Sequence, residues 1–274
     1  MPELPEVETT LRGLAPTVTG QRIVDVTVRE RRFRYFITSA TENAFKGQRI
    51  LAIRRRAKYL LLDLEQGVGL IHLGMSGSLR IVTPATPAAR HDHVDLALEN
   101  CCCIRFHDPR RFGLLHWVVQ PVEQHPLLRH LGIEPLAAEF NGAYLRQRAT
   151  GRRVNIKNFI MDQRVVVGVG NIYASEALYR AGIHPACIVN ALTRAQCDQL
   201  ATAIRTVLTA AIAHGGTTLR DFVREDGRPG YFVHELQVYQ RTGKPCYTCN
   251  TPICQQRLGQ RSSFFCPVCQ TLND

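Results

Sequence analysis

Residues 246–269 read CYTCNTPICQQRLGQRSSFFCPVC, and this stretch decides the fold of the C-terminal part of the chain. It contains two Cys-x-x-Cys pairs with sixteen residues between them, a spacing typical of four-cysteine zinc sites. Four thiolates complete a tetrahedral shell and leave no open position for a substrate. We therefore expect one structural Zn²⁺, held by Cys246, Cys249, Cys266 and Cys269.

The residues between the two cysteine pairs favour a β-hairpin. Phe264 and Phe265 are apolar, and Gly259 suits a tight turn. Arg261 then falls near the tip of the hairpin, where a guanidinium suits a groove or a phosphate group. Cys254 lies inside the loop and is not needed as a ligand.

Upstream of the cysteines the pattern is helical. Residues 195–213 carry apolar side chains at a spacing of about 3.6 residues, which predicts an amphipathic helix. Residues 120–141 contain three prolines and are typical of a linker. Residues 214–231 are polar, rich in glycine and long for a connection, which predicts a functional loop.

The first 119 residues follow a different pattern, with a helix predicted over residues 5–15 and stopped by Pro16. Short strand-like runs follow, separated by glycine, proline and charged turns. Such runs predict an antiparallel sandwich or barrel, covered by the N-terminal helix, and place the chain in the α+β class. The clearest strands are expected at residues 23–29, 59–64, 93–98 and 112–118.

The chain is strongly basic, with a formal net charge of +11 and an isoelectric point near 9.4. Arginine accounts for 30 of the 34 basic residues, since only four are lysines. This balance indicates a polyanionic partner, either nucleic acid or an acidic membrane surface. Arginine also suits bidentate phosphate contacts better than lysine does.

The start of the chain, MPELPEVE, has neither the positive segment nor the apolar segment of a secretory signal. No apolar run approaches the ~20 residues that span a bilayer, so no membrane-spanning segment is expected, and we expect no membrane partner. We therefore expect a reducing cytoplasm, where cysteines bind metal more often than they form disulfides. The triplet of residues 101–103 is interpreted as small strand residues.

A proline at position 2 permits removal of the initiator methionine, which leaves a secondary amine at the chain end. A model α-amino group titrates near 7.7–8.0, so about a tenth of it is neutral and nucleophilic at pH 7. Glu3 and Glu6 would lie near this amine if a helix began there, and could serve as a general acid and a supporting carboxylate. Acidic residues at a helix start are ordinarily partners of its dipole, so the pattern only permits this chemistry.

Six motifs, in order along residues 2–270, carry a resemblance to a known family. They are MPELPEVET, RRAKYLLL, HLGMSGSLR, DPRRFG, GVGNIYASE and the four-cysteine segment. Together they resemble bacterial formamidopyrimidine-DNA glycosylases. The resemblance implies a helix-covered β-sandwich, then a helical domain with a helix-two-turn-helix element and a β-hairpin zinc finger, with DNA in the cleft between the halves. The implied limits are 1–120 for the catalytic domain, 121–140 for a linker, 141–235 for the helical domain and 236–274 for the finger.

The resemblance implies base excision followed by strand cleavage at damaged double-stranded DNA. Its implied substrates are 8-oxoguanine and formamidopyrimidines. The nitrogen of Pro2 would attack C1′ of the damaged nucleoside, and the resulting iminium would permit β- and δ-elimination. Glu3 matches the acid that protonates the sugar ring oxygen, and Glu6 matches the carboxylate that supports the amine.

The same resemblance assigns DNA contacts. Lys58 corresponds to a lysine near the lesion and its phosphate, while Asn171 and Arg261 match residues that bind phosphates. Flipping a base out of the duplex leaves a gap, and the family fills this gap with three side chains. Taken one at a time, each of the three is ordinarily interpreted as a core or surface residue. The remaining implied contacts are His91 and Lys157, and the gap-filling residues are Met75, Arg110 and Phe112. The 214–231 segment aligns with the loop that closes over an everted 8-oxoguanine.

Two other functions remain compatible with the residues. The first is an endonuclease VIII-type glycosylase, which shares the Pro-Glu start but excises oxidised pyrimidines. The second is a non-catalytic zinc-ribbon protein that binds nucleic acid, which explains the charge and the cysteines but not the Pro-Glu start. In either glycosylase reading we expect a monomer, associated with the nucleoid in the bacterial cytoplasm.

Overall fold

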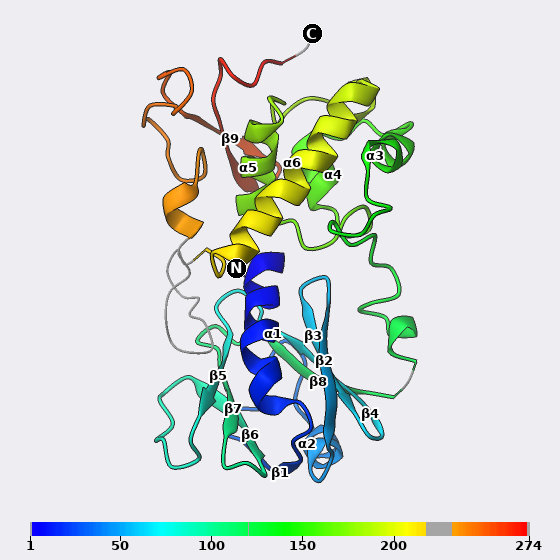
Figure 1. Ribbon diagram of the computed structural model, residues 1–274, viewed down its shortest axis with the longest axis vertical. Coiled ribbons are helices and arrows are strands. Elements are labelled where there is room, and N and C mark those ends of the chain that lie inside the picture. Colours follow the sequence, from blue (N-terminus) through cyan, green and yellow to red (C-terminus); the bar gives the residue numbers. More distant parts are fainter. Residues whose placement is uncertain (1, 120, 218–231, 273–274) are drawn as a thin grey trace. The chain divides into compact units, whose positions relative to one another are not determined.

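A computed structural model describes residues 2–119, 121–217 and 232–272 (Figure 1). The chain divides into two compact units. Unit 1 comprises Met1–Arg129 and His214–Val233, and unit 2 comprises His130–Ala213 and His234–Asp274. Most of the expected 214–231 loop, from residue 218 onward, lies outside the described residues. The four-part division expected from the sequence stays a prediction.

Unit 1 is built on two antiparallel four-stranded sheets that share one apolar core. Strands with alternating apolar residues turn one face of each sheet toward this core. The first sheet has the order β1 (Ile23–Val28), β6 (Asp92–Leu98), β7 (Cys103–His107) and β5 (Ser78–Val82). The second has the order β2 (Ile50–Arg56), β3 (Tyr59–Leu64), β4 (Gly67–His72) and β8 (Leu114–Val118). The predicted antiparallel sandwich is thereby confirmed.

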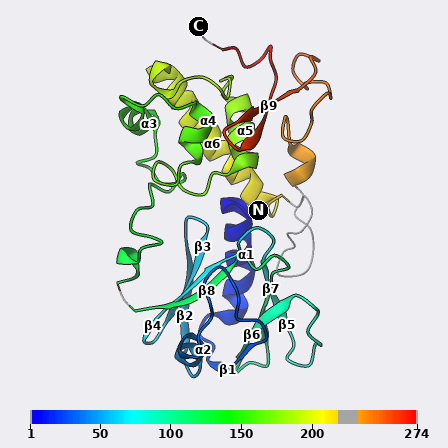
Figure 2. The same cartoon turned by 180° about the vertical axis from the view of Figure 1, so that it is seen from behind.

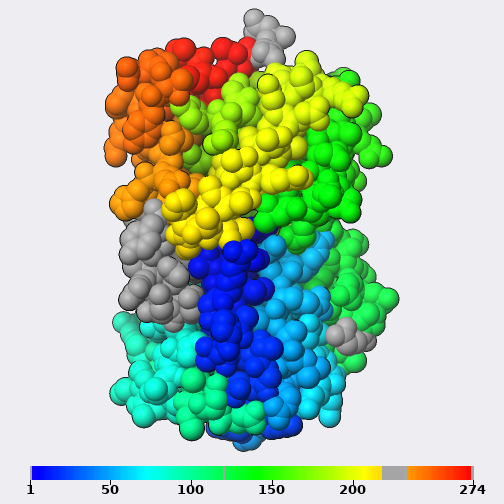
Figure 3. Space-filling view, viewed as in Figure 1, coloured from blue at the N-terminus to red at the C-terminus, as the bar shows by residue number. Residues whose placement is uncertain are grey.

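Helix α1 (Leu4–Val18) lies against strands of both sheets, and Figure 3 shows its outer side uncovered on the surface of unit 1. Val7 and Leu14 are buried in the shared core, as the apolar spacing predicts. The expectation that Pro16 stops the helix is wrong, because the helix continues to Val18. Proline lacks an N–H and so removes one bond of the last turn, but the N–H of Thr19 still donates to the carbonyl of Ala15. The unit also contains the short helix α2 (Ser39–Phe45) and the 3₁₀ turn η1 (Val122–Gln124), while the 3₁₀ turn η3 (Phe232–Glu235) begins in unit 1 and ends in unit 2.

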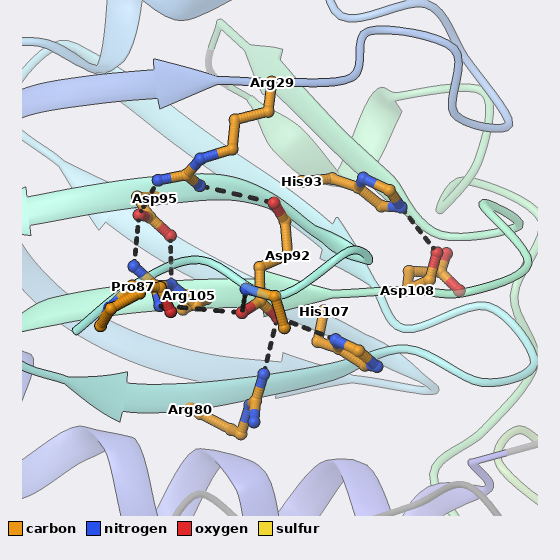
Figure 4. A network of polar contacts seen from close by, with 10 residues as sticks. Arg29, Arg80, Pro87, Asp92, His93, Asp95, Arg105, His107 and Asp108 are labelled. Carbon is orange, nitrogen blue, oxygen red and sulfur yellow. Dashed lines mark hydrogen bonds and ion pairs between the residues drawn. The ribbon is translucent and has the colours of Figure 1, made fainter.

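The face of the first sheet that points away from the core carries a buried network of charges (Figure 4). Arg105 is 2% exposed and binds both carboxylate oxygens of Asp95 at 2.8 Å. Asp95 also accepts from Arg29, and Asp92 accepts from Arg80 and His107. Burial opposes ionisation of Asp95, but the hydrogen bonds from Arg105 and Arg29 outweigh it and hold the pKa of Asp95 below its ordinary value. At pH values above the ordinary pKa of an aspartate, the ion pairs of Asp95 contribute their full stabilisation to the fold. This stabilisation is lost as the pH falls through the lowered pKa of Asp95.

Unit 2 is helical and ends in the predicted hairpin (Figure 2). The long helix α6 buries the apolar stripe expected for residues 195–213, and it packs against α3 and α5. The hairpin pairs Leu258 with Arg261, and Gly259 has a φ of +60° in its turn. The elements are α3 (Gly142–Ala149), α4 (Ile156–Met161), α5 (Asn171–Arg180), η2 (Val189–Ala191), α6 (Arg194–Ala213), η3 (Phe232–Glu235), β9 (Cys254–Leu258) and β10 (Arg261–Phe265).

Two further expectations concern the cysteine triplet and the membrane. Cys103 begins β7, but Cys101 lies in the preceding turn with a φ of 61° and is exposed. The interpretation of all three as strand residues is therefore wrong for Cys101 and Cys102, because both lie in the connection between β6 and β7. In the described part of the chain, no helix has the length and apolar character needed to cross a membrane.

The Arg105→Met variant should lower the free energy of unfolding by about 3–5 kcal/mol, because it leaves the buried Asp95 carboxylate without its two hydrogen bonds from Arg105. Urea denaturation at pH 7 measures the change. As a matched control, Lys46→Ala removes an ion pair with Asp25 in which both side chains are more than half exposed, and should change stability little. Equal effects of the two variants would contradict the importance of the buried network.

Candidate active site and nucleic-acid interface

The first turn of α1 places the predicted catalytic residues together, and all of them are buried. Pro2 is buried, Glu3 is 2% exposed at the N-cap of the helix, and Glu6 is 1% exposed. The N–H of Glu3 donates to Oε2 of Glu6 at 2.7 Å, and the N–H of Thr217 donates to Oε1 of the same carboxylate at 2.8 Å. Both oxygens of Glu6 are thus used to hold the backbone beside Pro2.

Gly216 allows this approach of residues 216–217 to the helix. Its φ is +81°, and a Cβ at this position would lie 3.0 Å from Oε1 of Glu6. Any other residue would be strained in this conformation and crowded against the carboxylate. The contact between Glu6 and Thr217 therefore depends on a glycine at position 216.

Lys58 lies at the tip of the β2–β3 hairpin and is 3% exposed. The turn residue before it, Ala57, has a φ of 55°, a conformation that costs a residue with a Cβ free energy. Arg55 donates to the carbonyl of Ala57 at 3.0 Å and to Glu8 of α1 at 2.8 Å. These bonds attach the strained turn to the same helix that carries the glutamates, so Lys58 is fixed with respect to α1.

His72, at the end of β4, belongs to this region although sequence reasoning did not select it. Burial, together with the positive charges of Lys58 and Arg34, lowers the pKa of His72 to about 4. Nδ1 of His72 accepts the N–H of Gly74 at 2.9 Å, so the neutral ring carries its hydrogen on Nε2. The only signal in the sequence was its place at the head of the motif HLGMSG.

The three predicted gap-filling residues lie on two neighbouring loops of unit 1. Met75 is 38% exposed in the β4–β5 loop, and Phe112 is 47% exposed in the β7–β8 loop. Arg110 is also exposed, with its guanidinium carbon 4.9 Å from the centroid of the Phe112 ring. A Cβ on Gly74 would lie 2.5 Å from the nitrogen of Gly113, so the loops approach each other closely. Their exposure excludes the ordinary interpretation of Met75 and Phe112 as core residues.

His91 stands at the start of β6, half-buried, in a group of three histidines. Its ring centroid is 6.0 Å from those of His93 and His107. The N–H of Asp108 donates to the carbonyl of His91 at 3.0 Å, which connects it with the β7–β8 loop. His91 thus has a structural link to the loop that carries Arg110 and Phe112.

In unit 2, Asn171 is the first residue of α5 and follows Gly170 at the N-cap. The start of a helix favours anions, because its N–H groups and its dipole both point toward them. Within the part of the chain that the structure describes, the buried Oδ1 of Asn171 has no hydrogen-bond partner.

Lys157 of α4 lies against the β9–β10 hairpin, which carries Arg261. Lys157 is 1% exposed, and its ammonium donates to the carbonyl of Ser262 at 2.7 Å and to the hydroxyl of Ser263 at 2.9 Å. These bonds hold β10 directly after Arg261, whose side chain is exposed. The expectation that Lys157 contacts DNA stays a prediction, and the structure places its ammonium on the protein.

The four predicted cysteines form a group that can hold a metal ion. Their sulfur atoms all lie within 4.8 Å of one another, with 3.9 Å between Cys246 and Cys269 and 3.4 Å between Cys249 and Cys266. A tetrahedral site with metal–sulfur bonds of about 2.3 Å requires sulfur atoms roughly 3.8 Å apart. The set therefore fits a four-thiolate ion, and Cys254 is not part of it.

Glu176 is a second residue that sequence reasoning did not select. This carboxylate of α5 is 4% exposed and accepts the N–H groups of Gln237, Val238 and Tyr239 at 2.8–3.0 Å. The hydroxyl of Tyr179, also on α5, lies 2.8 Å from that of Thr248 in the first cysteine pair. Helix α5 therefore holds both the candidate anion site and the base of the finger.

Comparison with known proteins gives a family for this arrangement. Residues 1–115 match the family model of the formamidopyrimidine-DNA glycosylase N-terminal domain, and residues 131–223 match that of the formamidopyrimidine-DNA glycosylase H2TH domain. The chain belongs to the formamidopyrimidine-DNA glycosylase family. The H2TH match covers α3 to α6 of unit 2.

Relatives agree over their full length. The formamidopyrimidine-DNA glycosylase of Methylococcus capsulatus is 56% identical over 98% of this chain and 100% of its own. The crystal structure of the MutM (Fpg) protein from Thermus thermophilus is 39% identical, with a TM-score of 0.88 and complete coverage of both chains. A complex between the Lactococcus lactis Fpg and an abasic site containing DNA is 32% identical, with a TM-score of 0.91, covering 98% of this chain and 99% of that one.

We predict a specific pH dependence of stability from His72. Between pH 6.5 and about 4 the unfolded chain binds a proton that the folded chain does not, so the free energy of unfolding falls as the pH falls through this window. The full loss is roughly 3 kcal/mol. His72→Gln should remove this part of the pH dependence. Urea denaturation from pH 7 to pH 4 measures it, and unchanged slopes in the variant would refute the assignment.

Proposed function

We propose that this chain is a bifunctional DNA glycosylase and AP lyase that removes 8-oxoguanine and formamidopyrimidines through Pro2. Its membership in a family of DNA glycosylases of base excision repair is the starting point. The observation that carries the proposal is the buried first turn of α1, where the Glu6 carboxylate fixes the backbone beside Pro2 and Glu3.

The proposed reaction begins when Met1 is removed and Pro2 has a free secondary amine. This nitrogen attacks C1′ of the damaged nucleoside, and the base leaves with the electron pair of its glycosidic bond and takes up the proton that the nitrogen loses. The C1′–O4′ bond then breaks as the Glu3 carboxyl donates its proton to the ring oxygen, and the nitrogen lone pair forms the C1′=N bond. The ring-opened sugar is then joined to Pro2 as an iminium. Loss of a C2′ proton expels the 3′ phosphate, and a second elimination expels the 5′ phosphate.

The proposed role of the other residues is to hold damaged double-stranded DNA. Lys58 and His91 of unit 1, and Asn171, Lys157 and Arg261 of unit 2, are assigned to the nucleic acid, in line with the net charge of +11. Met75, Arg110 and Phe112 are assigned to the space left by the flipped nucleotide, because all three are exposed on adjoining loops.

Borohydride trapping tests the proposal. With 8-oxoguanine DNA and borohydride, a covalent protein–DNA adduct should form, and mass mapping should place it on residue 2. A variant with an extra residue before Pro2 should bind DNA without forming the adduct. DNA binding by the unaltered chain without any adduct would favour the non-catalytic zinc-ribbon function.

The choice of lesion separates this proposal from an endonuclease VIII-type activity. Excision from duplexes with 8-oxoguanine opposite cytosine is compared with excision from duplexes with thymine glycol. The proposal requires preference for the purine lesion. The further proposals of a monomer and of a nucleoid location in the cytoplasm are tested by light scattering and by fluorescence imaging.

Glu3→Gln should lower the rate of base excision by about 10²–10⁴-fold, because it removes the proposed general acid. Cleavage at a preformed abasic site, which needs no protonation for base loss, should be kept. Single-turnover rates on the two substrates measure the difference. Glu99→Gln, which changes an exposed acid of the same unit, is the matched control. Equal loss of both activities in Glu3→Gln would contradict the assigned role.

We propose that the metal in the four-cysteine site is Zn²⁺, because four thiolates suit this ion and leave it a structural role. About one equivalent should be found per chain by elemental analysis. Cys246→Ser should lose the metal and weaken DNA binding, since the hairpin that carries Arg261 would lose its base. Cys254→Ser should keep both, because this cysteine is outside the ligand group. Full metal retention in Cys246→Ser would overturn the ligand assignment.

A further inference from the structure

Asp108 is a fully buried carboxylate that the proposed chemistry does not use. Its exposure is 0%, and it stands at the end of β7 where the loop with Arg110 and Phe112 begins. A buried carboxylate is ordinarily hydrogen-bonded, so the partners of Asp108 indicate which segments of the chain it holds in place.

The side chain of Asp108 joins the two loops that carry the gap-filling residues. Oδ1 accepts the hydroxyl of Ser76 at 3.0 Å and the N–H of Arg110 at 3.3 Å, and Oδ2 accepts the N–H of Gly113 at 2.8 Å. Ser76 directly follows Met75, while Arg110 and Gly113 enclose Phe112. One carboxylate therefore binds next to each of the three residues.

The backbone of Asp108 makes a further set of contacts. Its N–H donates to the carbonyl of His91 at 3.0 Å. Its carbonyl lies 3.1 Å from Nε2 of His93 (Figure 4) and accepts the N–H of Arg111 at 3.2 Å. His91, the fourth DNA contact assigned to this region, is thus connected to the same residue.

We propose that Asp108 is the positioning residue that fixes Met75, Arg110, Phe112 and His91 in one arrangement before DNA binds. This proposal deepens the proposed function and rests on it. Flipping a base out of the duplex costs stacking and pairing energy, and side chains that occupy the gap can compensate part of this cost. Loops whose backbone is held by a buried carboxylate lose little conformational freedom when their side chains enter the duplex. Asp108 therefore acts on extrusion of the damaged base and not on the steps at C1′.

Asp108→Asn tests the proposal with little change in volume. The amide can accept on only one side, so at least one of the three donors loses its acceptor. The readout is the ratio of the single-turnover rate of 8-oxoguanine excision to that of cleavage at a preformed abasic site. We expect this ratio to fall by about tenfold or more, in line with the loss of a hydrogen bond to a charged group. Ser76→Ala, which keeps two of the three donors, should lower it less.

Two controls separate positioning from general stability. Asp95→Asn alters another buried carboxylate of the same sheet, whose partners are Arg29 and Arg105. It should lower the melting temperature without changing the ratio. The defect of Asp108→Asn should also shrink when the lesion stands opposite an abasic-site analogue, because no base pair then has to be broken. A defect in folding alone would not respond to the opposite strand.

An unchanged ratio in Asp108→Asn, or an equal fall in Asp95→Asn, would overturn the positioning role. Either result leaves the proposed function intact if the unaltered chain excises 8-oxoguanine and is trapped by borohydride. If the unaltered chain neither excises 8-oxoguanine nor is trapped by borohydride, the proposed function itself is contradicted. The same duplexes therefore distinguish failure of the proposed function from failure of the positioning role.

Discussion

The Glu6 carboxylate accepts one backbone N–H from its own helix and one from Thr217, more than two hundred residues away in the chain. The end of a chain is ordinarily its most mobile part. Here it is the start of a helix that packs on two sheets, and its first turn is fixed by a buried acid. The amine proposed at position 2 would thereby have the fixed surroundings that catalysis needs.

Two of the four lysines are buried, so the exposed positive charge of the chain is mainly that of its arginines. Lys58 and Lys157 are almost completely buried, whereas the arginines assigned to DNA are exposed. A compact ammonium suits a defined position with few partners, while the planar guanidinium suits contact with phosphates and bases. In unit 1 the buried ammonium also helps to keep His72 neutral, so the site offers a hydrogen-bond donor there without an added charge.

Periodicity and cysteine spacing were sufficient to predict the sandwich, the long helix and the C-terminal hairpin with its group of four cysteines. These elements depend on local pattern, and β3, for example, has the predicted limits. The course of α1 past Pro16 was not predictable in this way, because packing on two sheets outweighs the loss of one hydrogen bond. Propensity rules describe isolated helices, and tertiary contacts override them.

The candidate site was predictable where a residue stands in a motif, and much less so where its role depends on distant partners. Pro2, Glu3 and the cysteines could be selected from spacing and from the resemblance. Asp108 lies inside the motif DPRRFG, but its bonds to Ser76 and Gly113 form only after the sheet brings the loops together. Glu176 likewise acquires its three donors from residues about sixty positions later.

The bonds from Lys157 to Ser262 and Ser263 have a consequence for protein engineering. The hairpin of residues 254–265 is not an independent structural unit, because the ammonium of Lys157 in helix α4 donates hydrogen bonds to strand β10. A chimera that receives this hairpin from a relative must also receive a matching residue at position 157. Without it, the buried side chain at position 157 and the transplanted strand would not form these hydrogen bonds. A sequence alignment of the hairpin alone does not reveal this mismatch.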